Sequence, residues 1–229
     1  MNVQFELGAL RYTIQRFVLL VIFAGLLFCF AGRWNWLRGW EYVVTVGLAE
    51  AATLAVLAWR APATLNERGK LHGETARFDR LFASMWLALS FATPIVAGLE
   101  VRSGAPLLSW SVFWVGVPIL LAATAFGAWA MLENEHFEQF VRIQDDRAHR
   151  VVDSGPYRIV RHPGYLAAIV GAFVTPLVLG TTSAFVPAVM LAALFVWRTA
   201  REDETLRRDL PGYADYSKRT RARLFPALW

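Results

Sequence analysis

The stretch RHPGYLAAIVGAFVTPLVLGTTSAFVPAVMLAALFVWR, residues 161–198, decides the fold class. It contains two apolar runs, at about 165–180 and 184–198, and only the polar segment GTTS separates them. Because so short a connection joins antiparallel neighbours, we predict a tight helical hairpin. Both runs are shorter than the roughly 20 apolar residues that cross a bilayer as a helix. Neighbouring protein should therefore cover part of this pair.

Four further apolar runs precede the hairpin, at about 17–32, 42–59, 81–99 and 110–131. The chain has 229 residues and is 56% hydrophobic, whereas soluble domains are usually about 45–50% apolar. No internal repeat or low-complexity linker divides it. We therefore expect an all-α integral membrane protein with about six transmembrane helices, folded as a single domain over residues 1–229.

The cationic residues lie unevenly between these spans. The loops at 60–80 and 133–163 and the tail from Arg198 onward are rich in arginine, whereas the other connections carry few cations. The positive-inside rule places arginine-rich loops in the cytoplasm, so we expect a multi-pass protein with both termini and both long loops cytoplasmic. We interpret the net charge of +5 as attraction to anionic membrane lipids and expect no nucleic-acid partner.

The segment SGPYRIVRHPGY, residues 154–165, indicates where the fifth span begins. Gly155 and Pro156 are typical of a turn. A residue before proline avoids helical geometry, so His162 should be extended, and Pro163 suits the first helical position. We therefore predict that a helix starts at Pro163 with its positive dipole end and unpaired N–H groups at the cytoplasmic face, where an anionic group can bind.

The same segment supplies cations and aromatic rings. Arg158 and Arg161 add positive charge, and Tyr157 and Tyr165 add aromatic faces with hydroxyl groups. Together they could hold a ligand with a carboxylate and a flat ring. These residue types also occur in interfacial belts that anchor helix ends among lipid headgroups, and the segment alone leaves both interpretations open.

A second polar cluster follows the sixth span, in FVWRTAREDETLRRDLPGYADY, residues 195–216. Arg198 and Glu202 are four residues apart and share one face of a helix. A charge at the edge of an apolar run is costly unless it pairs or reaches water, so the pair is a candidate site. An ordinary ion pair on a solvated helix or a snorkelling arginine would explain it equally.

The combination of motifs resembles the isoprenylcysteine carboxyl methyltransferase family, which includes related membrane phospholipid methyltransferases. The resemblance rests on GPYRIVRHPGY, on REDETL after the hairpin, and on LPGYADYSKRTRARLFP. It is strongest over 140–226, where VRIQDDRAHRVV precedes these motifs, and weaker at APATLNERGK and FDR in the second loop. Within residues 1–132, the first four spans match only in hydropathy.

This resemblance implies a membrane methyltransferase that uses S-adenosylmethionine, held in a cytoplasmic pocket formed by residues 133–229. The cofactor contacts that it implies are Gly155, Pro156, Tyr157, Arg161, His162, Pro163, Tyr165, Glu202 and Asp203. The residue types agree, because carboxylates suit the ammonium group or the ribose hydroxyls, and aromatic rings suit adenine or the sulfonium.

The two residues that we expect to be catalytic are Arg198 and Glu202. A carboxylate acceptor is already ionised and needs only a cation, for which we choose Arg198. An amine or phenol needs a base, for which Glu202, His162 and His136 are candidates. The acceptor should be a lipophilic small molecule or a prenylated substrate that enters from the bilayer, and we hypothesise that residues 66–68 cap its pocket.

Two other classes of function remain open at this point. A membrane reductase of the sterol-reductase type would bind NADPH near the same helices, and a non-enzymatic membrane protein would bind neither cofactor. Glu50 is an acidic residue inside a span, and its simplest interpretation is a pair with a polar neighbour. His72, His136 and His149 lack metal-ligand spacing, so we expect no metal. The acceptor and the oligomeric state are not determined by the sequence.

Overall fold

The computed structural model describes residues 7–70, 77–138, 149–226 and 229. Within these ranges every regular element is helical. The long helices are α1 (Leu7–Ala31), α2 (Leu37–Arg60), α4 (Arg77–Arg102), α5 (Trp110–Glu133), α6 (Pro163–Leu179) and α7 (Phe185–Asp209). The short ones are α3 (Pro62–Glu67), the 3-10 helix η2 (Gly155–Arg158) and α8 (Tyr213–Arg219). The prediction of an all-helical fold is confirmed for this part of the chain.

Four of the described helices, α1, α2, α4 and α5, are long and apolar enough to cross a bilayer. Helix α6 is apolar but has 17 residues, which span about 26 Å. Helix α7 has 25 residues, but its C-terminal third, REDETLRRD, is mostly charged. The protein is therefore an integral membrane protein, and crossing of the membrane by α6 and α7 stays a prediction.

The hairpin of α6 and α7 follows from the residues between them. Gly180 adopts a left-handed conformation (φ 78°) and ends α6. The carboxylate of Glu100, from α4, accepts hydrogen bonds from the backbone N–H groups of Thr182 (2.9 Å) and Ser183 (2.6 Å). These bonds satisfy donors just before α7, which a helix start otherwise leaves unpaired. The predicted tight connection is confirmed.

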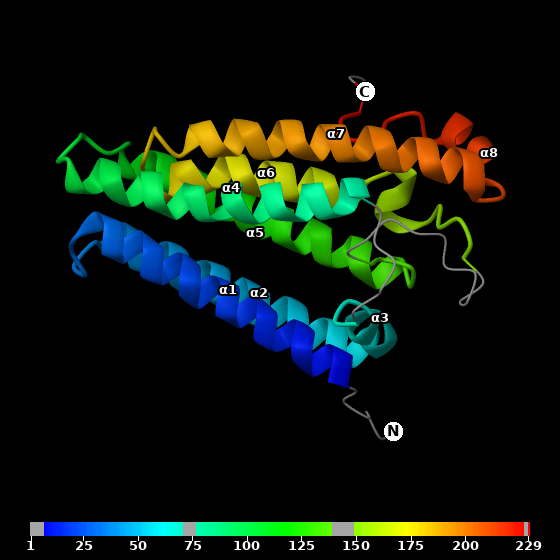
Figure 1. Ribbon diagram of the computed structural model, residues 1–229, viewed down its shortest axis with the longest axis horizontal. Coiled ribbons are helices and arrows are strands. Elements are labelled where there is room, and N and C mark those ends of the chain that lie inside the picture. The colour runs from blue at the N-terminus through cyan, green and yellow to red at the C-terminus, as the bar shows by residue number, and fades with distance from the viewer. Residues whose placement is uncertain (1–6, 71–76, 139–148, 227–228) are drawn as a thin grey trace.

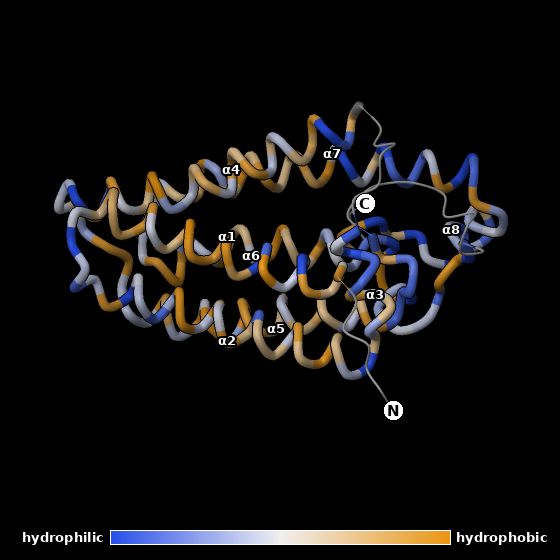
Figure 2. Tube along the Cα trace, turned by 60° about the horizontal axis from the view of Figure 1, so that its bottom comes forward, coloured by the Kyte–Doolittle hydropathy of each residue, from blue (hydrophilic) through white to orange (hydrophobic). Residues whose placement is uncertain are grey.

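The helices pack tightly at one end and diverge toward the other (Figure 1). At the tight end α1 contacts α4 closely, because a Cβ atom on Gly98 would lie 2.7 Å from the carbonyl oxygen of Leu27. Toward the opposite end the α1–α2 hairpin separates from α4, α6 and α7. The start of α1, α3 and α8 lie at this diverging end, where the hydrophilic residues gather (Figure 2).

A large cavity occupies the space between the diverging helices. It measures about 1510 Å³, including its open parts. All six long helices contribute to its wall, and the residues that α6 contributes are all small: Gly164, Ala167, Ala168, Gly171, Ala172 and Thr175. Gly171 leaves real space, because a Cβ atom there would meet no atom within 4 Å.

Candidate functional site

The start of α6 is held in place by the C-terminal tail. His162 precedes the helix with φ −126°, and Pro163 occupies the first helical position, as the sequence predicts. The backbone N–H groups of Arg161 and His162 donate to the carbonyls of Ala222 (2.9 Å) and Arg223 (3.0 Å). Because both bonds are to the tail, residues far along the chain fix the geometry of this helix end.

The turn before α6 packs on the end of α5. Gly155 has φ 53°, and a Cβ atom there would lie 2.9 Å from the Glu133 side chain. The hydroxyl of the buried Tyr157 accepts a hydrogen bond from Asn134 Nδ2 (3.1 Å), and its carbonyl accepts one from the Tyr216 hydroxyl (2.7 Å). Burial raises the pKa of Tyr157 well above its ordinary value, so the phenol stays neutral.

Arg161 and Asp203 form a buried two-pronged ion pair. Arg161 Nε lies 2.7 Å from Asp203 Oδ1, and Nη2 lies 3.0 Å from Oδ2. The Nη1 group donates to the carbonyls of Thr220 (2.9 Å) and Arg221 (2.8 Å). Four hydrogen bonds therefore engage this guanidinium, which links α6, α7 and the tail.

Asp203 gathers further partners on its other sides. The Tyr213 hydroxyl donates to it at 2.9 Å, and Arg223 Nε donates at 3.0 Å. Burial by itself would raise the pKa of Asp203, but the hydrogen bonds and positive charges of His162 and Arg161 outweigh that effect and hold the pKa far below its usual value. The carboxylate is therefore ionised at every physiological pH.

Glu202, the adjacent residue, has a different environment. Its carboxylate accepts a hydrogen bond from the Tyr165 hydroxyl, and Arg198 Nε donates to the same hydroxyl at 2.8 Å. Arg198 in turn pairs with Asp79 of α4, at 3.1 Å. A continuous chain of polar contacts therefore runs from Asp79 through Arg198 and Tyr165 to Glu202.

His162 completes the group around Glu202. Its Nδ1 atom lies 3.8 Å from Glu202 Oε1, and its ring stacks on that of Tyr165 with an interplanar angle of 3° and centroids 5.7 Å apart. The Glu202 side chain keeps 20% of its surface exposed, against 1% for Asp203. Of the two neighbouring carboxylates, Glu202 is therefore the one that a ligand can reach.

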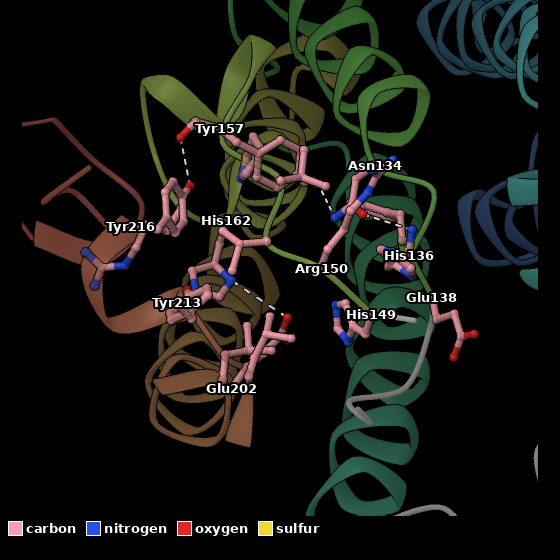
Figure 3. Close-up of a pocket in the computed structure, with 18 of the residues that line it drawn as sticks. Asn134, His136, Glu138, His149, Arg150, Tyr157, His162, Glu202, Tyr213 and Tyr216 are labelled. Atoms are coloured by element: carbon pink, nitrogen blue, oxygen red, sulfur yellow. Dashed lines mark hydrogen bonds and ion pairs between the residues drawn. The ribbon is translucent and has the colours of Figure 1, made fainter. Parts of the chain in front are cut away.

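These side chains line a polar cavity of about 830 Å³, including its open mouth. Figure 3 shows Tyr157, His162, Glu202 and Tyr213 around it. The structure brings together seven of the residues expected from sequence: Tyr157, Arg161, His162, Pro163, Tyr165, Arg198 and Glu202. Gly155, Pro156 and Asp203 lie behind the wall and do not line the cavity. Any contribution of theirs to binding is therefore through the residues they support.

Several residues of the wall were not among the predicted ones. Asn134 and Phe137 follow α5, and Tyr213 and Tyr216 belong to α8. The two tyrosines are three residues apart on one helix, so GYADY could have indicated a shared face. Asp79 lies in the FDR motif, but the sequence did not indicate its pairing with Arg198, because that partner is on a helix far along the chain.

The polar cavity meets the large cavity at Phe137 and Gly164, which line both. The Phe137 ring packs on the start of α6, since a Cβ atom on Gly164 would lie 2.6 Å from it. The Arg68 guanidinium lies 4.9 Å from the ring centroid of Tyr12 and 5.0 Å from that of Phe137. The segment 66–68 thus reaches this junction, and its role as a cap stays a prediction.

The histidines fall in different places. His136 and His149 line the polar cavity, and their rings contact at a tilt of 38°, with centroids 4.5 Å apart. His72 lies outside the described residues, as does part of VRIQDDRAHRVV. Within the described ranges, no group of three or more histidine, cysteine or acidic residues is arranged to hold a metal ion.

Comparison with known proteins finds one family. Residues 114–208 match the profile of the isoprenylcysteine carboxyl methyltransferase (ICMT) family. The matched region runs from α5 into the last turns of α7 and includes the start of α6, Arg198 and Glu202. A comparison with curated proteins found no match. The family match favours the methyltransferase interpretation over a reductase or a non-enzymatic protein.

Proposed function

Because residues 114–208 match the isoprenylcysteine carboxyl methyltransferase family, we propose that the chain belongs to this family and methylates a lipophilic acceptor with S-adenosylmethionine. The family match and the four apolar helices support a membrane methyltransferase in general. The cofactor, the acceptor and the roles of individual residues are our proposal. The observation that carries it is the polar cavity at the start of α6, which opens inward onto the large cavity.

The polar cavity offers partners for the carboxylate, the ammonium group and the adenine ring of S-adenosylmethionine. His162, Pro163 and Gly164 line it, so the positive end of the α6 dipole is available to the carboxylate of the cofactor. Arg161 is committed to Asp203 and the tail, which leaves the helix end as the better anion site. Glu202 is accessible and suits the ammonium group. The aromatic faces of Tyr157 and Tyr213 suit adenine.

Bound in this cavity, S-adenosylmethionine supplies an electrophilic methyl carbon next to a positively charged sulfur. The protein has to align the acceptor with that carbon and to exclude water. Tyr165 and Glu202 hold one another through their hydrogen bond, and Arg198 fixes the Tyr165 hydroxyl. We propose that this chain of contacts sets the position of the cofactor relative to the acceptor.

The large cavity would hold the lipophilic part of the acceptor. Along α6 it extends from Gly164 to Thr175, eleven residues or about 17 Å of helix. That length is close to half of the roughly 30 Å hydrocarbon thickness of a bilayer. A smaller cavity between α1, α2 and α4 shares part of its wall and reaches Leu87, whose side chain is 39% exposed. We propose this opening as the entry from the bilayer.

For the reacting group we propose a carboxylate. It is ionised at neutral pH and needs no base, only positive charge to hold it. Arg198 lines the polar cavity and retains its charge beside Asp79. An amine or phenol acceptor would instead need Glu202 as a base, and Glu202 is already the acceptor in a hydrogen bond from Tyr165.

The deciding experiment is a calorimetric titration of the purified protein with S-adenosylhomocysteine, and with NADPH in parallel. We expect saturable binding of S-adenosylhomocysteine that Glu202→Ala weakens at least tenfold. Glu204→Ala is the matched control, because Glu204 is exposed on the same helix and does not line the cavity. Binding of NADPH alone, or equal affinities in the two variants, would contradict the proposal.

A further inference from the structure

The ring of Phe137 lies at the boundary between the polar cavity and the large cavity. Among the described residues, Phe137 and Gly164 are the two that line both. Gly164 allows the ring to lie directly against the start of α6, because a Cβ atom on Gly164 would come within 2.6 Å of Cζ and 2.9 Å of Cε2 of Phe137. The ring therefore borders the passage from one cavity to the other.

A short turn fixes the position of Phe137. Helix α5 ends at Glu133, and the Asn134 side chain then accepts a hydrogen bond from the N–H of His136 (2.9 Å), an arrangement typical of asparagine in turns. The carbonyl of Asn134 accepts a second bond, from the N–H of Phe137 (3.1 Å). Asn134 Nδ2 donates to the hydroxyl of Tyr157, which lines the polar cavity (Figure 3). The turn that carries the ring is thus tied to the polar side of the boundary.

Arg68 holds the same ring from the side of the large cavity. Its guanidinium lies 5.0 Å from the ring centroid of Phe137 and 4.9 Å from that of Tyr12, within the roughly 6 Å at which a cation is attracted to an aromatic face. Arg68 lines the large cavity and not the polar one. The segment that carries Arg68 is fixed to α1, because Asn66 Oδ1 accepts a hydrogen bond from the N–H of Ala9 (3.2 Å). The ring is therefore held from both sides of the boundary.

The proposed reaction gives such a boundary a chemical purpose. Moving a methyl group from a sulfonium to a carboxylate breaks a carbon–sulfur bond, forms a carbon–oxygen bond and removes one positive and one negative charge, while no proton moves. The transition state is therefore less charged than the reactants. Water stabilises the separated charges and so slows the step, whereas a site that excludes water favours it. An apolar ring at the junction would keep the water of the polar cavity away from the reacting carboxylate.

We propose that Phe137 is a positioning residue whose ring forms a partition between the two cavities. The ring excludes water from the lipid side of the junction and limits the positions that the reacting group of the acceptor can take. This inference rests on the proposed function, but the partition itself is measurable without turnover. A phenylalanine that only packs in the fold would affect stability alone, so reagent access and methyl transfer are the readouts that separate the two roles.

Thiol labelling measures the partition directly. Ala167 lines the large cavity three residues after Gly164, whereas Leu206 lines the polar cavity. Ala167→Cys and Leu206→Cys are each made in the full chain with Cys29→Ala, which removes the exposed native thiol. The variants are placed in nanodiscs and treated with a charged, membrane-impermeant methanethiosulfonate. We expect the thiol at 206 to react quickly and the thiol at 167 slowly, and Phe137→Ala to accelerate severalfold the reaction at 167 alone.

The second measurement is methyl transfer to S-farnesyl-N-acetylcysteine, a farnesylated carboxylate. We expect Phe137→Ala to lower kcat about tenfold, on the scale of a displaced or rehydrated reacting group, and to change the affinity for S-adenosylhomocysteine much less. Phe137→Leu keeps an apolar side chain and should restore most of the protection and of kcat. Phe126→Ala is the matched control, since Phe126 is also half-buried, packs edge-on against Trp129 and lines none of the cavities described above.

Three results would overturn the proposal. They are equally fast labelling at 167 and 206 when Phe137 is present, no acceleration by Phe137→Ala, and an acceleration that leaves kcat unchanged. Equal losses of kcat and of melting temperature in Phe137→Ala and Phe126→Ala would also contradict it, because both residues would then only stabilise the fold.

Titration of S-adenosylhomocysteine into the same samples distinguishes this failure from that of the proposed function. If the wild-type chain binds S-adenosylhomocysteine and methylates the farnesylated probe but shows no partition, this inference alone fails. If the wild-type chain neither binds S-adenosylhomocysteine nor transfers a methyl group, the proposed function fails, and the positioning role of Phe137 fails with it, whatever the labelling rates.

Discussion

Asp79 of α4 and Arg198 of α7 form an ion pair at 3.1 Å at the edge of the candidate site, with side chains 0% and 3% exposed. The Arg198 guanidinium also lies 4.0 Å from the ring centroid of Phe82. Arg198 is therefore neither a snorkelling residue nor an isolated cation. It joins two helices and at the same time orients Tyr165, so its loss should affect both stability and activity.

A double-mutant cycle separates those effects. Removing one partner of a buried pair leaves the other charge uncompensated and costs about 3–5 kcal/mol. We expect Asp79→Asn and Arg198→Gln each to lower the melting temperature, and the combined variant to be more stable than the sum of the two losses predicts. Additive losses in thermal unfolding would show that the two residues act independently.

The hydroxyl of Tyr165 connects Arg198 to Glu202, which makes it a sensitive test of the site. Tyr165→Phe keeps the ring that stacks on His162 and removes only the two hydrogen bonds. We expect the affinity for S-adenosylhomocysteine to fall about tenfold, as the loss of a hydrogen bond to a charged group implies, with little change in melting temperature. Unchanged affinity would mean that the hydrogen bond from Tyr165 to Glu202 does not contribute to cofactor binding.

The sequence predicted local features of this site and not its long-range contacts. The start of α6 follows from His162 and Pro163, because proline restricts both residues. The end of α6 follows from the glycine in GTTS, which tolerates the left-handed conformation. These features depend on neighbours in the chain, so they can be inferred from a few letters of sequence.

The division of roles between Glu202 and Asp203 could not be inferred in the same way. Successive helical residues point about 100° apart, so one of the two carboxylates had to lie away from the cavity. Which one depends on where Arg161 and Tyr213 lie, and those positions follow from tertiary packing. The position of Arg161 also follows from tertiary packing. It was expected to bind an anion, but its guanidinium bonds Asp203 and the tail carbonyls instead.

The depressed pKa of Asp203 gives a prediction about pH. In the unfolded chain the pKa of an aspartate is about 3.9, and in the folded protein the pKa of Asp203 lies well below that value. As pH falls, the unfolded state therefore binds the proton first. The stabilisation from Asp203 should be complete above about pH 5 and decline as the pH falls further.

The comparison that isolates this effect is between wild type and Asp203→Asn. We expect the variant to have a clearly lower melting temperature at pH 7, because three arginines lose their shared carboxylate, and the gap to narrow toward pH 4. Asp215→Asn is the control, since the Asp215 side chain is 73% exposed and should change little. A gap that is constant over this pH range would show that the charge of Asp203 does not stabilise the fold.

Gly171 gives direct control over the space proposed for the lipid tail. It lines the large cavity, and a Cβ atom there would meet nothing within 4 Å. Gly171→Leu should therefore fold normally and fill part of the cavity about two helical turns below Gly164. We expect S-adenosylhomocysteine to bind as before, and the affinity for a farnesylated acceptor to fall more than that for a geranylated one, because the longer tail reaches the obstruction.

Gly25 supplies the matched control for this change. A Cβ atom on Gly25 also meets nothing within 4 Å, but the residue is exposed on α1 and lines none of the cavities described above. Gly25→Leu should therefore leave the affinity for both acceptors unchanged. If Gly171→Leu also left both affinities unchanged, the tail would have to bind elsewhere, and the large cavity would be a packing feature of the bundle. A loss of affinity that is equal for both tail lengths would place the obstruction nearer to the head of the acceptor than the spacing along α6 indicates.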